Sequence, residues 1–204
     1  MCRTRCLGCA VVASIVLSGA LQGDVLVTDS EFAFNFVAES QNLQLFEESL
    51  DDYSGFASSF SGGSGDWAWE LSSSEGVFAG DSSIRAGAGQ TALELTFASD
   101  QVYAIGGEFQ LLDQEGAPMN GLIQLLLSDG TSYISTVGSV QAFAGFISDD
   151  VNITSLSVIG FGAYAPDVTS VSSFTIGVIP APGALTLLGV GFGIGGSGLR
   201  RRRG

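Results

Sequence analysis

Short stretches in which polar and apolar residues alternate constrain the fold of this chain more than any other feature. Residues 92–97 read ALELTF, and residues 31–36 read EFAFNF with their phenylalanines on one side. A two-residue period with one polar face is typical of a half-buried β-strand. By the same reasoning we expect further strands at residues 67–71, 102–109, 122–127, 132–137, 142–147, 153–159 and 170–178.

The segments between these stretches favour antiparallel pairing. Ser128-Asp129-Gly130-Thr131 joins two expected strands and contains the Asp-Gly pair of tight hairpins. Residues 54–66 and 71–89 are expected to be surface loops, and only residues 43–50 carry apolar residues at helical spacing. About nine or ten short strands in residues 24–178 predict an all-β fold, namely an antiparallel two-sheet sandwich of the jelly-roll kind.

The charge of this central part argues against one large class of partner. All 21 acidic residues lie between Asp24 and Asp167, and Arg85 is the only basic residue between Arg5 and Arg200. Residues 24–180 therefore carry a formal net charge of −20. This central part, residues 24–180, is called the body below. Its negative charge repels phosphate backbones, so we expect no nucleic-acid binding, and it would attract divalent cations or basic surfaces instead.

The absence of histidine excludes several kinds of site. Neither Ser-His-Asp nor Cys-His nucleophilic machinery can form, and zinc cannot be bound through imidazole. The three cysteines, Cys2, Cys6 and Cys9, lie in the first nine residues. If those residues are removed, the mature protein has no thiol, disulfide or thiolate metal site. We therefore expect neither a cofactor nor a metal centre, and no enzymatic activity.

Residues 1–23 predict a secretory signal peptide. Arg3 and Arg5 precede an apolar stretch at residues 6–17, and Ser18 and Ala20 supply small residues for signal peptidase. Cleavage after Ala20 fits best, and cleavage just before Asp24 is the alternative.

The last residues predict a membrane-spanning segment. Residues 183–199 contain no charge and include seven glycines. As a helix they would be about 25 Å long, slightly shorter than the roughly 30 Å hydrocarbon core. A cluster of arginines follows and would stay on the cytoplasmic side by the positive-inside rule: Arg200, Arg201, Arg202 and Arg203.

Residues 179–204 resemble the PEP-CTERM sorting signal of exported bacterial proteins. The motif residues are Pro180, Ala181 and Pro182, with Ala181 where the family has glutamate. The resemblance implies recognition in the inner membrane by an exosortase, a transpeptidase-like protease. The protein would then pass to the cell surface or to extracellular polymer, with a structural or adhesive role. More loosely, residues 104–159 resemble the lectin-like and jelly-roll bodies that often accompany this tail, through IGGEF and AFAGF.

Two alternative functions remain open. Trp67 and Trp69, with Tyr53 and Phe56 nearby, could stack on the rings of an extracellular polysaccharide, as in a carbohydrate-binding module, or could fill the core. Paired carboxylates could hydrolyse a glycosidic bond without histidine, although no pair is marked by the sequence. Acidic clusters could also supply oxygen ligands to Ca²⁺, although no Asp-x-Asp-x-Asp-Gly loop is present. These clusters are residues 47–48, 51–52, 113, 115 and 149–150.

Overall fold

The computed structural model describes residues 25–87, 92–113, 115–162 and 168–180. Its helices are α1 (Glu31–Ser40) and the 3₁₀ helix η1 (Gly65–Trp67). Its strands are β1 (Val25–Thr28), β2 (Gln44–Ser49), β3 (Gly55–Gly62), β4 (Trp69–Gly80), β5 (Ser83–Ala86), β6 (Ala92–Phe97), β7 (Val102–Leu112), β8 (Pro118–Met119), β9 (Gly121–Leu127), β10 (Ser132–Val137), β11 (Ala142–Ser148), β12 (Ser155–Gly162) and β13 (Val168–Val178).

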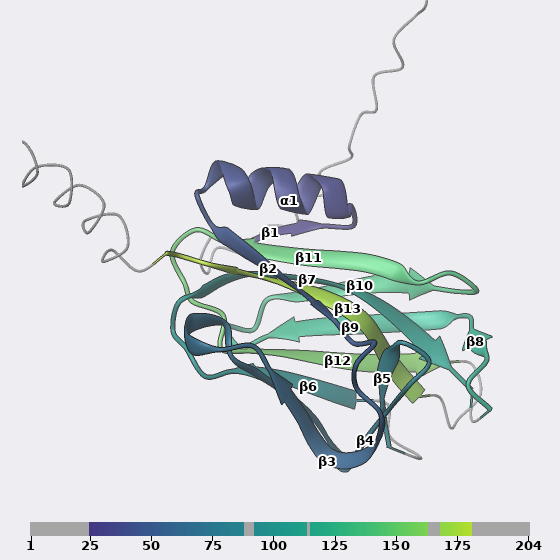
Figure 1. Ribbon diagram of the computed structural model, residues 1–204. Helices are drawn as coiled ribbons and strands as arrows, with labels where there is room; N and C mark the ends of the chain where they lie inside the picture. The colour runs from purple at the N-terminus through teal and green to yellow at the C-terminus, as the bar shows by residue number, and fades with distance from the viewer. Residues whose placement is uncertain (1–24, 88–91, 114, 163–167, 181–204) are drawn as a thin grey trace, which may run out of the picture.

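All described strand pairs are antiparallel, which confirms the all-β, antiparallel part of the prediction. The strands form one hydrogen-bonded sheet in the order β1-β11-β7-β13-β5-β4-β6-β12-β9-β10, with β2 on β13, β3 on β4 and β8 on β7. The sheet turns at β5, which pairs with β13 at only two positions. Two layers result, and β10 contacts β7 and β11 on the opposite side, so the sheet nearly closes on itself (Figure 1). The two expected sheets are therefore joined through β5.

The main hydrophobic core lies between the two layers. Phe146, Ile105 and Phe174 point into it from the layer that contains β7, β11 and β13. Leu125 and Leu93 point into it from the other layer, and all five side chains are at most 1% exposed. Alternation along each strand therefore buries one face, as the sequence pattern predicts.

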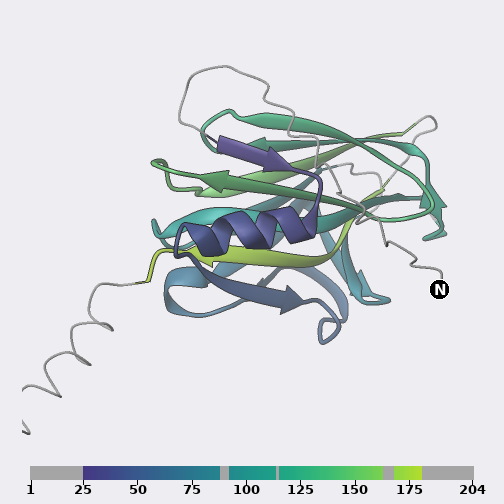
Figure 2. The ribbon, with the colours of Figure 1, turned by 90° about the horizontal axis from the view of Figure 1, so that it is seen from above.

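Residues 31–36 form the first turns of α1 and not the predicted strand. Ser30 caps the helix by accepting a hydrogen bond from the Ala33 amide, and Glu31 places a negative charge in the first turn. Phe34 and Ala38 lie four residues apart on the buried face. The helix covers the outer face of the layer formed by β1, β11 and β7 (Figures 1 and 2), which gives a second hydrophobic cluster.

Two glycines on neighbouring strands make room for Phe34. Gly106 of β7 pairs with Gly145 of β11 beneath α1. A Cβ at Gly145 would lie 2.5 Å from Phe34 Cδ2, and one at Gly106 would lie 2.8 Å from Phe143 Cζ. Glycine at 145 is therefore required for Phe34 to pack at its observed depth, and a Cβ at 106 would displace the Phe143 ring beside it. These are the glycines of the IGGEF and AFAGF sequences.

Other local predictions have mixed outcomes. The hairpin at residues 128–131 is confirmed, because β9 and β10 pair around it and Gly130 has φ +90°. Residues 43–50 form β2 rather than a helix, because they pair along the edge of β13. The expected loops at residues 54–66 and 71–89 contain β3, most of β4, and β5. Their serine- and glycine-rich sequences pair with one another and with β6.

The strand register brings the first and last strands of the described body level with each other. Leu26 of β1 is opposite Ile147, Ile147 is opposite Ala104, and Ala104 is opposite Gly177 of β13. Because β1 runs antiparallel to β13 across this layer, the start of β1 and the end of β13 lie at the same end of the sheet.

Candidate functional site

The β4–β5 hairpin presents the only basic side chain of the body. Asp81 and Ser82 both have positive φ, 53° and 57°, as a two-residue type I′ turn requires. Ser83 Oγ donates a hydrogen bond to the Gly80 carbonyl at 3.1 Å and tightens this turn. Phe78 and Arg85 are directly opposite each other on the two strands. The Arg85 guanidinium carbon lies 4.7 Å from the Phe78 ring centroid, in a cation–π contact.

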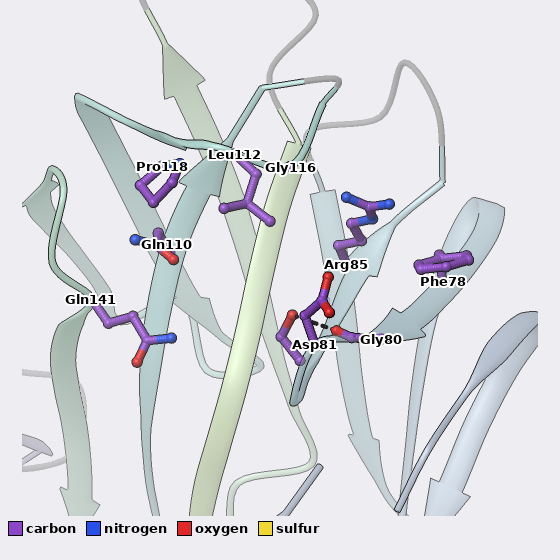
Figure 3. Close-up of a pocket in the computed structure, with 10 residues that line it drawn as sticks. Phe78, Gly80, Asp81, Arg85, Gln110, Leu112, Gly116, Pro118 and Gln141 are labelled. Atoms are coloured by element: carbon purple, nitrogen blue, oxygen red, sulfur yellow. Dashed lines mark hydrogen bonds between the residues drawn. The ribbon is translucent and has the colours of Figure 1, made fainter. Parts of the chain in front are cut away.

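A pocket of about 120 Å³ opens beside this pair (Figure 3). Arg85, Ser170 and Gln110 share one row across β5, β13 and β7, so the short Ser170 side chain lies between two long ones. Gln141 reaches the pocket from the segment before β11. Figure 3 shows Gln110 and Gln141 on one side of β13, and Arg85 and Phe78 on the other. The remaining lining residues are Gly80, Asp81, Ser83, Leu112, Gly116 and Pro118.

The turn between β7 and β8 forms one wall of this pocket. Gly116 has φ +87°, and a Cβ on it would lie only 3.0 Å from Arg85 Nη1. Asp113 holds the turn, because its Oδ1 accepts a hydrogen bond from the Ala117 amide at 2.7 Å. This carboxylate, one of those considered for Ca²⁺, thus has a local structural partner.

The electrostatics of the pocket are set by Arg85. Among the residues that the structure describes, no carboxylate forms an ion pair with it, although Asp81 lines the same pocket. The guanidinium packs against the Phe78 ring and lines the pocket, and the Gln110 and Gln141 side chains line it across β13 (Figure 3). The arrangement offers planar donors, amide donors and acceptors, and a partly exposed aromatic ring to a polar ligand.

The two tryptophans lie in an aromatic cluster away from this pocket. Trp69 is 3% exposed, packs edge-on against Phe174 at 4.9 Å, and donates from Nε1 to Glu48 at 3.2 Å. Trp67, in η1, stacks on Phe46 with ring centroids 4.8 Å apart. The ring faces of Trp69 thus belong to the core, while Trp67 is half-buried and covered on one side. Tyr53 joins the cluster, and Phe56 lies on β3, opposite Phe78 and 68% exposed.

The acidic clusters have mostly local roles. Hydrogen bonds from Ser82 and Ser49 hold the pKa of Asp51 below its usual value. Within the described ranges, no group of three or more acidic residues has the geometry of a metal site. Glu31, Glu47 and Glu108 line a second pocket of about 200 Å³ at the edge of α1, and Glu108 accepts a hydrogen bond from Ser172.

Most of the predicted export and sorting residues lie outside the described residues. These are Ser18, Ala20, Ala181, Pro182, Arg200, Arg201, Arg202 and Arg203. Pro180 is described and follows β13 by two residues. No helix in the described ranges is both long and apolar enough to cross a bilayer.

Comparisons with known proteins give no family assignment. No family model and no curated protein matches the chain. Among solved structures it is similar to a family two carbohydrate esterase from Cellvibrio japonicus, with 11% identity and a TM-score of 0.39 over 69% of this chain. It spans only 36% of that esterase. A family 29 carbohydrate-binding module from Piromyces equi shows 12% identity and a TM-score of 0.36, over 67% of this chain and 92% of the module. Scores at this level assign neither a family nor a ligand.

The sequence pattern did not single out this pocket. Its side chains come from four separate segments, which strand pairing brings together. The one usable signal was that Arg85 is the sole basic residue of an otherwise acidic body. The described part of the chain is thus an antiparallel β-domain with a polar pocket, lined by an arginine that forms no ion pair with any described residue.

Proposed function

We propose that this is an exported, non-enzymatic protein of the cell surface or extracellular polymer, delivered by a PEP-CTERM-like tail. The observation that carries the proposal is where the folded body ends. Val178 is the last paired residue of β13, and the Ile179 amide makes a last backbone hydrogen bond to Gln101. The Pro180-Ala181-Pro182 motif starts at the next residue. A protease acting at that motif would therefore leave every strand of the body intact.

Mass spectrometry of both termini of the protein from its native cells tests this proposal. We expect a first residue at Leu21 or Asp24 and a last residue near Pro180 to Pro182. In a variant with Pro180→Ala and Pro182→Ala, we expect the tail to stay attached and the protein to remain in the inner membrane. An intact Arg203-Gly204 end in the unmodified protein would show a plain membrane anchor and would overturn the sorting proposal.

The pocket around Arg85 favours a second candidate function, the binding of carbohydrate by the β-domain. Sugars are recognised by planar polar side chains that contact hydroxyl groups and by aromatic rings that contact C–H faces. Gln110, Gln141 and Arg85 supply the first kind of group, and the 38% exposed Phe78 supplies the second. This site supports the role better than Trp67 and Trp69, because Trp69 is buried.

Isothermal titration calorimetry with a panel of neutral and acidic polysaccharides tests carbohydrate binding. We expect at least one polysaccharide to bind, and we expect Gln141→Ala to weaken that binding. The matched control is Gln101→Ala, which removes an amide that bonds only its neighbour Asp100. Lack of binding across the whole panel would refute this candidate function.

A further inference from the structure

We infer that the Arg85 pocket takes a carboxylate-bearing sugar, that is, a uronate residue of an acidic polysaccharide. The inference rests on the carbohydrate-binding role proposed above and specifies its ligand class. It starts from Arg85, which forms no ion pair with any carboxylate among the residues that the structure describes, although Asp81 lines the same pocket. In a body with 21 acidic residues and one basic residue, an arginine would be expected to pair with a carboxylate. Across the described residues, Arg85 has only its cation–π contact with Phe78.

The surroundings of the guanidinium suit the binding of a carboxylate. Arg85 is half-buried, with Phe78 opposite it on β4 and Gly116 of the β7–β8 turn close to Nη1. The cation–π contact with Phe78 orients the long side chain, which lowers the entropy cost of binding a ligand. A planar guanidinium that is held in this way suits a carboxylate, which accepts two parallel hydrogen bonds from it.

The other lining groups suit a sugar ring that bears the carboxylate. Gln110 and Gln141 can donate to and accept from hydroxyl groups, and Ser83 adds a hydroxyl on the hairpin side. The Asp81 carboxylate, also on that side, can only accept hydrogen bonds and so suits sugar hydroxyls rather than the sugar carboxylate. Phe78 offers an apolar surface at the rim. A phosphate or sulfate group is better matched by several cations or a row of backbone amides, whereas this pocket has a single cation.

The size of the pocket favours one residue of a polymer over a whole small molecule. Its volume of about 120 Å³ is below the roughly 300–1,000 Å³ of typical small-molecule sites. One projecting sugar with its carboxylate is therefore the expected occupant, and the polymer would continue outside. The negative charge of the body opposes a polyanion at long range, so we expect binding to strengthen as salt is raised from low ionic strength to about 0.1 M.

Calorimetry on the full-length chain in a non-ionic detergent, with defined probes, tests the inference. The probes are an oligogalacturonate, its methyl ester, a neutral oligosaccharide of equal length, and free glutamate as a carboxylate without a sugar ring. We expect only the oligogalacturonate to bind well. Arg85→Gln should weaken its binding roughly 10- to 100-fold, the effect of losing hydrogen bonds to a charged group. Arg85→Lys should recover part of that loss.

The matched control is Gln44→Glu, which changes the net charge by the same amount as Arg85→Gln. Gln44 is exposed on β2, opposite Val178 near the end of β13. Arg85 is opposite Ser170, near the start of β13. We expect Gln44→Glu to change binding by less than about twofold. Thermal unfolding of both variants checks that each remains folded.

The outcomes separate this inference from the proposal on which it rests. Equal binding of the acid and its methyl ester would overturn the uronate inference and leave carbohydrate binding supported. Equal binding of free glutamate would overturn the sugar part of the inference. Unchanged affinity in Arg85→Gln would overturn the assignment to this pocket. Absence of binding to both acidic and neutral oligosaccharides would overturn the inference together with carbohydrate binding.

Discussion

Glu48 links two rings of the aromatic cluster, Trp69 and Tyr53, by accepting a hydrogen bond from each. Its carboxylate receives Trp69 Nε1 at 3.2 Å and the Tyr53 hydroxyl at 3.3 Å. Trp69 is 3% exposed, and its indole N–H donates to this partly buried carboxylate. The carboxylate thus satisfies a donor inside a tightly packed group of rings, and the stability of this group depends on it.

Removing the Glu48 carboxylate should destabilise the fold. We expect Glu48→Ala to lower the free energy of unfolding by about 1–3 kcal/mol, because it leaves the Trp69 N–H unsatisfied. Glu48→Gln keeps an acceptor and should cost less. Urea unfolding, followed by tryptophan fluorescence, measures both. Equal stability of the alanine variant and the parent protein would show that the hydrogen bond to Trp69 contributes nothing.

Tyr53 makes the stability of the fold sensitive to alkaline pH. Burial, followed by the charge and hydrogen bond of Glu48, raises the pKa of Tyr53 above its usual value of 10.0. The folded state therefore favours the protonated phenol. The stability that this provides is fully present below pH 10 and is lost as the pH rises through the raised pKa.

Tyr53→Phe should therefore flatten this pH dependence. We expect the free energy of unfolding of the parent protein to fall more steeply than that of the variant as the pH rises above about 10. Urea unfolding at a series of pH values measures the two slopes. Identical slopes would contradict the role of Tyr53.

At the scale of elements, α1 shows why alternation alone can mislead. Phenylalanines at 32, 34 and 36 satisfy a two-residue period, yet on a helix Phe34 faces the sheet while Phe32 and Phe36 point outward. The Ser30 cap, the acidic first turn and the Phe34–Ala38 spacing together favour the helix. The glycine pair at 106 and 145 gives Phe34 its space, and that long-range pairing is not visible in a local window.

Substitutions in α1 should separate its two faces. We expect Phe34→Ala to cost about 3–5 kcal/mol in unfolding free energy, because the side chain is fully buried. Phe32→Ala is the matched control, since Phe32 is 82% exposed, and should stay within about 0.5 kcal/mol of the parent protein. Denaturant unfolding measures both. Similar costs for the two changes would mean that α1 does not pack through Phe34.

The strands β3 to β5 mark the limit of composition as a guide. Their segments are rich in serine and glycine, which favours a loop prediction. In the folded chain the same residues pair for most of their length, and φ exceeds +50° at Gly55, Gly76, Asp81 and Ser82. Regular alternation was sufficient for β6, β9 and β10, whereas these strands depend on their neighbours. The Arg85 pocket depends on the same pairings, so only its arginine stood out in the sequence.

At the scale of the whole molecule, the described hydrophobic core extends to the end of β13. Ile176 and Val178 are 0% and 3% exposed and belong to the main cluster, whereas Ile179 is 41% exposed. Residues beyond Pro180 are thus expected to add nothing to the hydrophobic core that the described residues form.

Two truncated chains test this boundary. A chain of residues 24–180 should fold with full cooperativity, whereas one of residues 24–175 loses two buried side chains. We expect the shorter chain to be less stable by roughly 3–6 kcal/mol, from about 1.5–3 kcal/mol for each buried side chain. Circular dichroism and urea unfolding compare them. A longer chain that fails to fold would show that residues after Pro180 belong to the fold.

The strand register also indicates how the domain would be oriented on a bilayer. One row across the sheet contains Leu26, Ile147, Ala104 and Gly177. Its outer members are three strand spacings apart, about 14 Å, and on the export route proposed above both terminal segments would leave from this end of the sheet. Gln110 lies six residues further along β7 than Ala104, about 20 Å away, and Arg85 shares its row. A protein still tethered by its tail would therefore hold the Arg85 pocket away from the lipid. Polymer chains could reach that pocket before release as readily as after it.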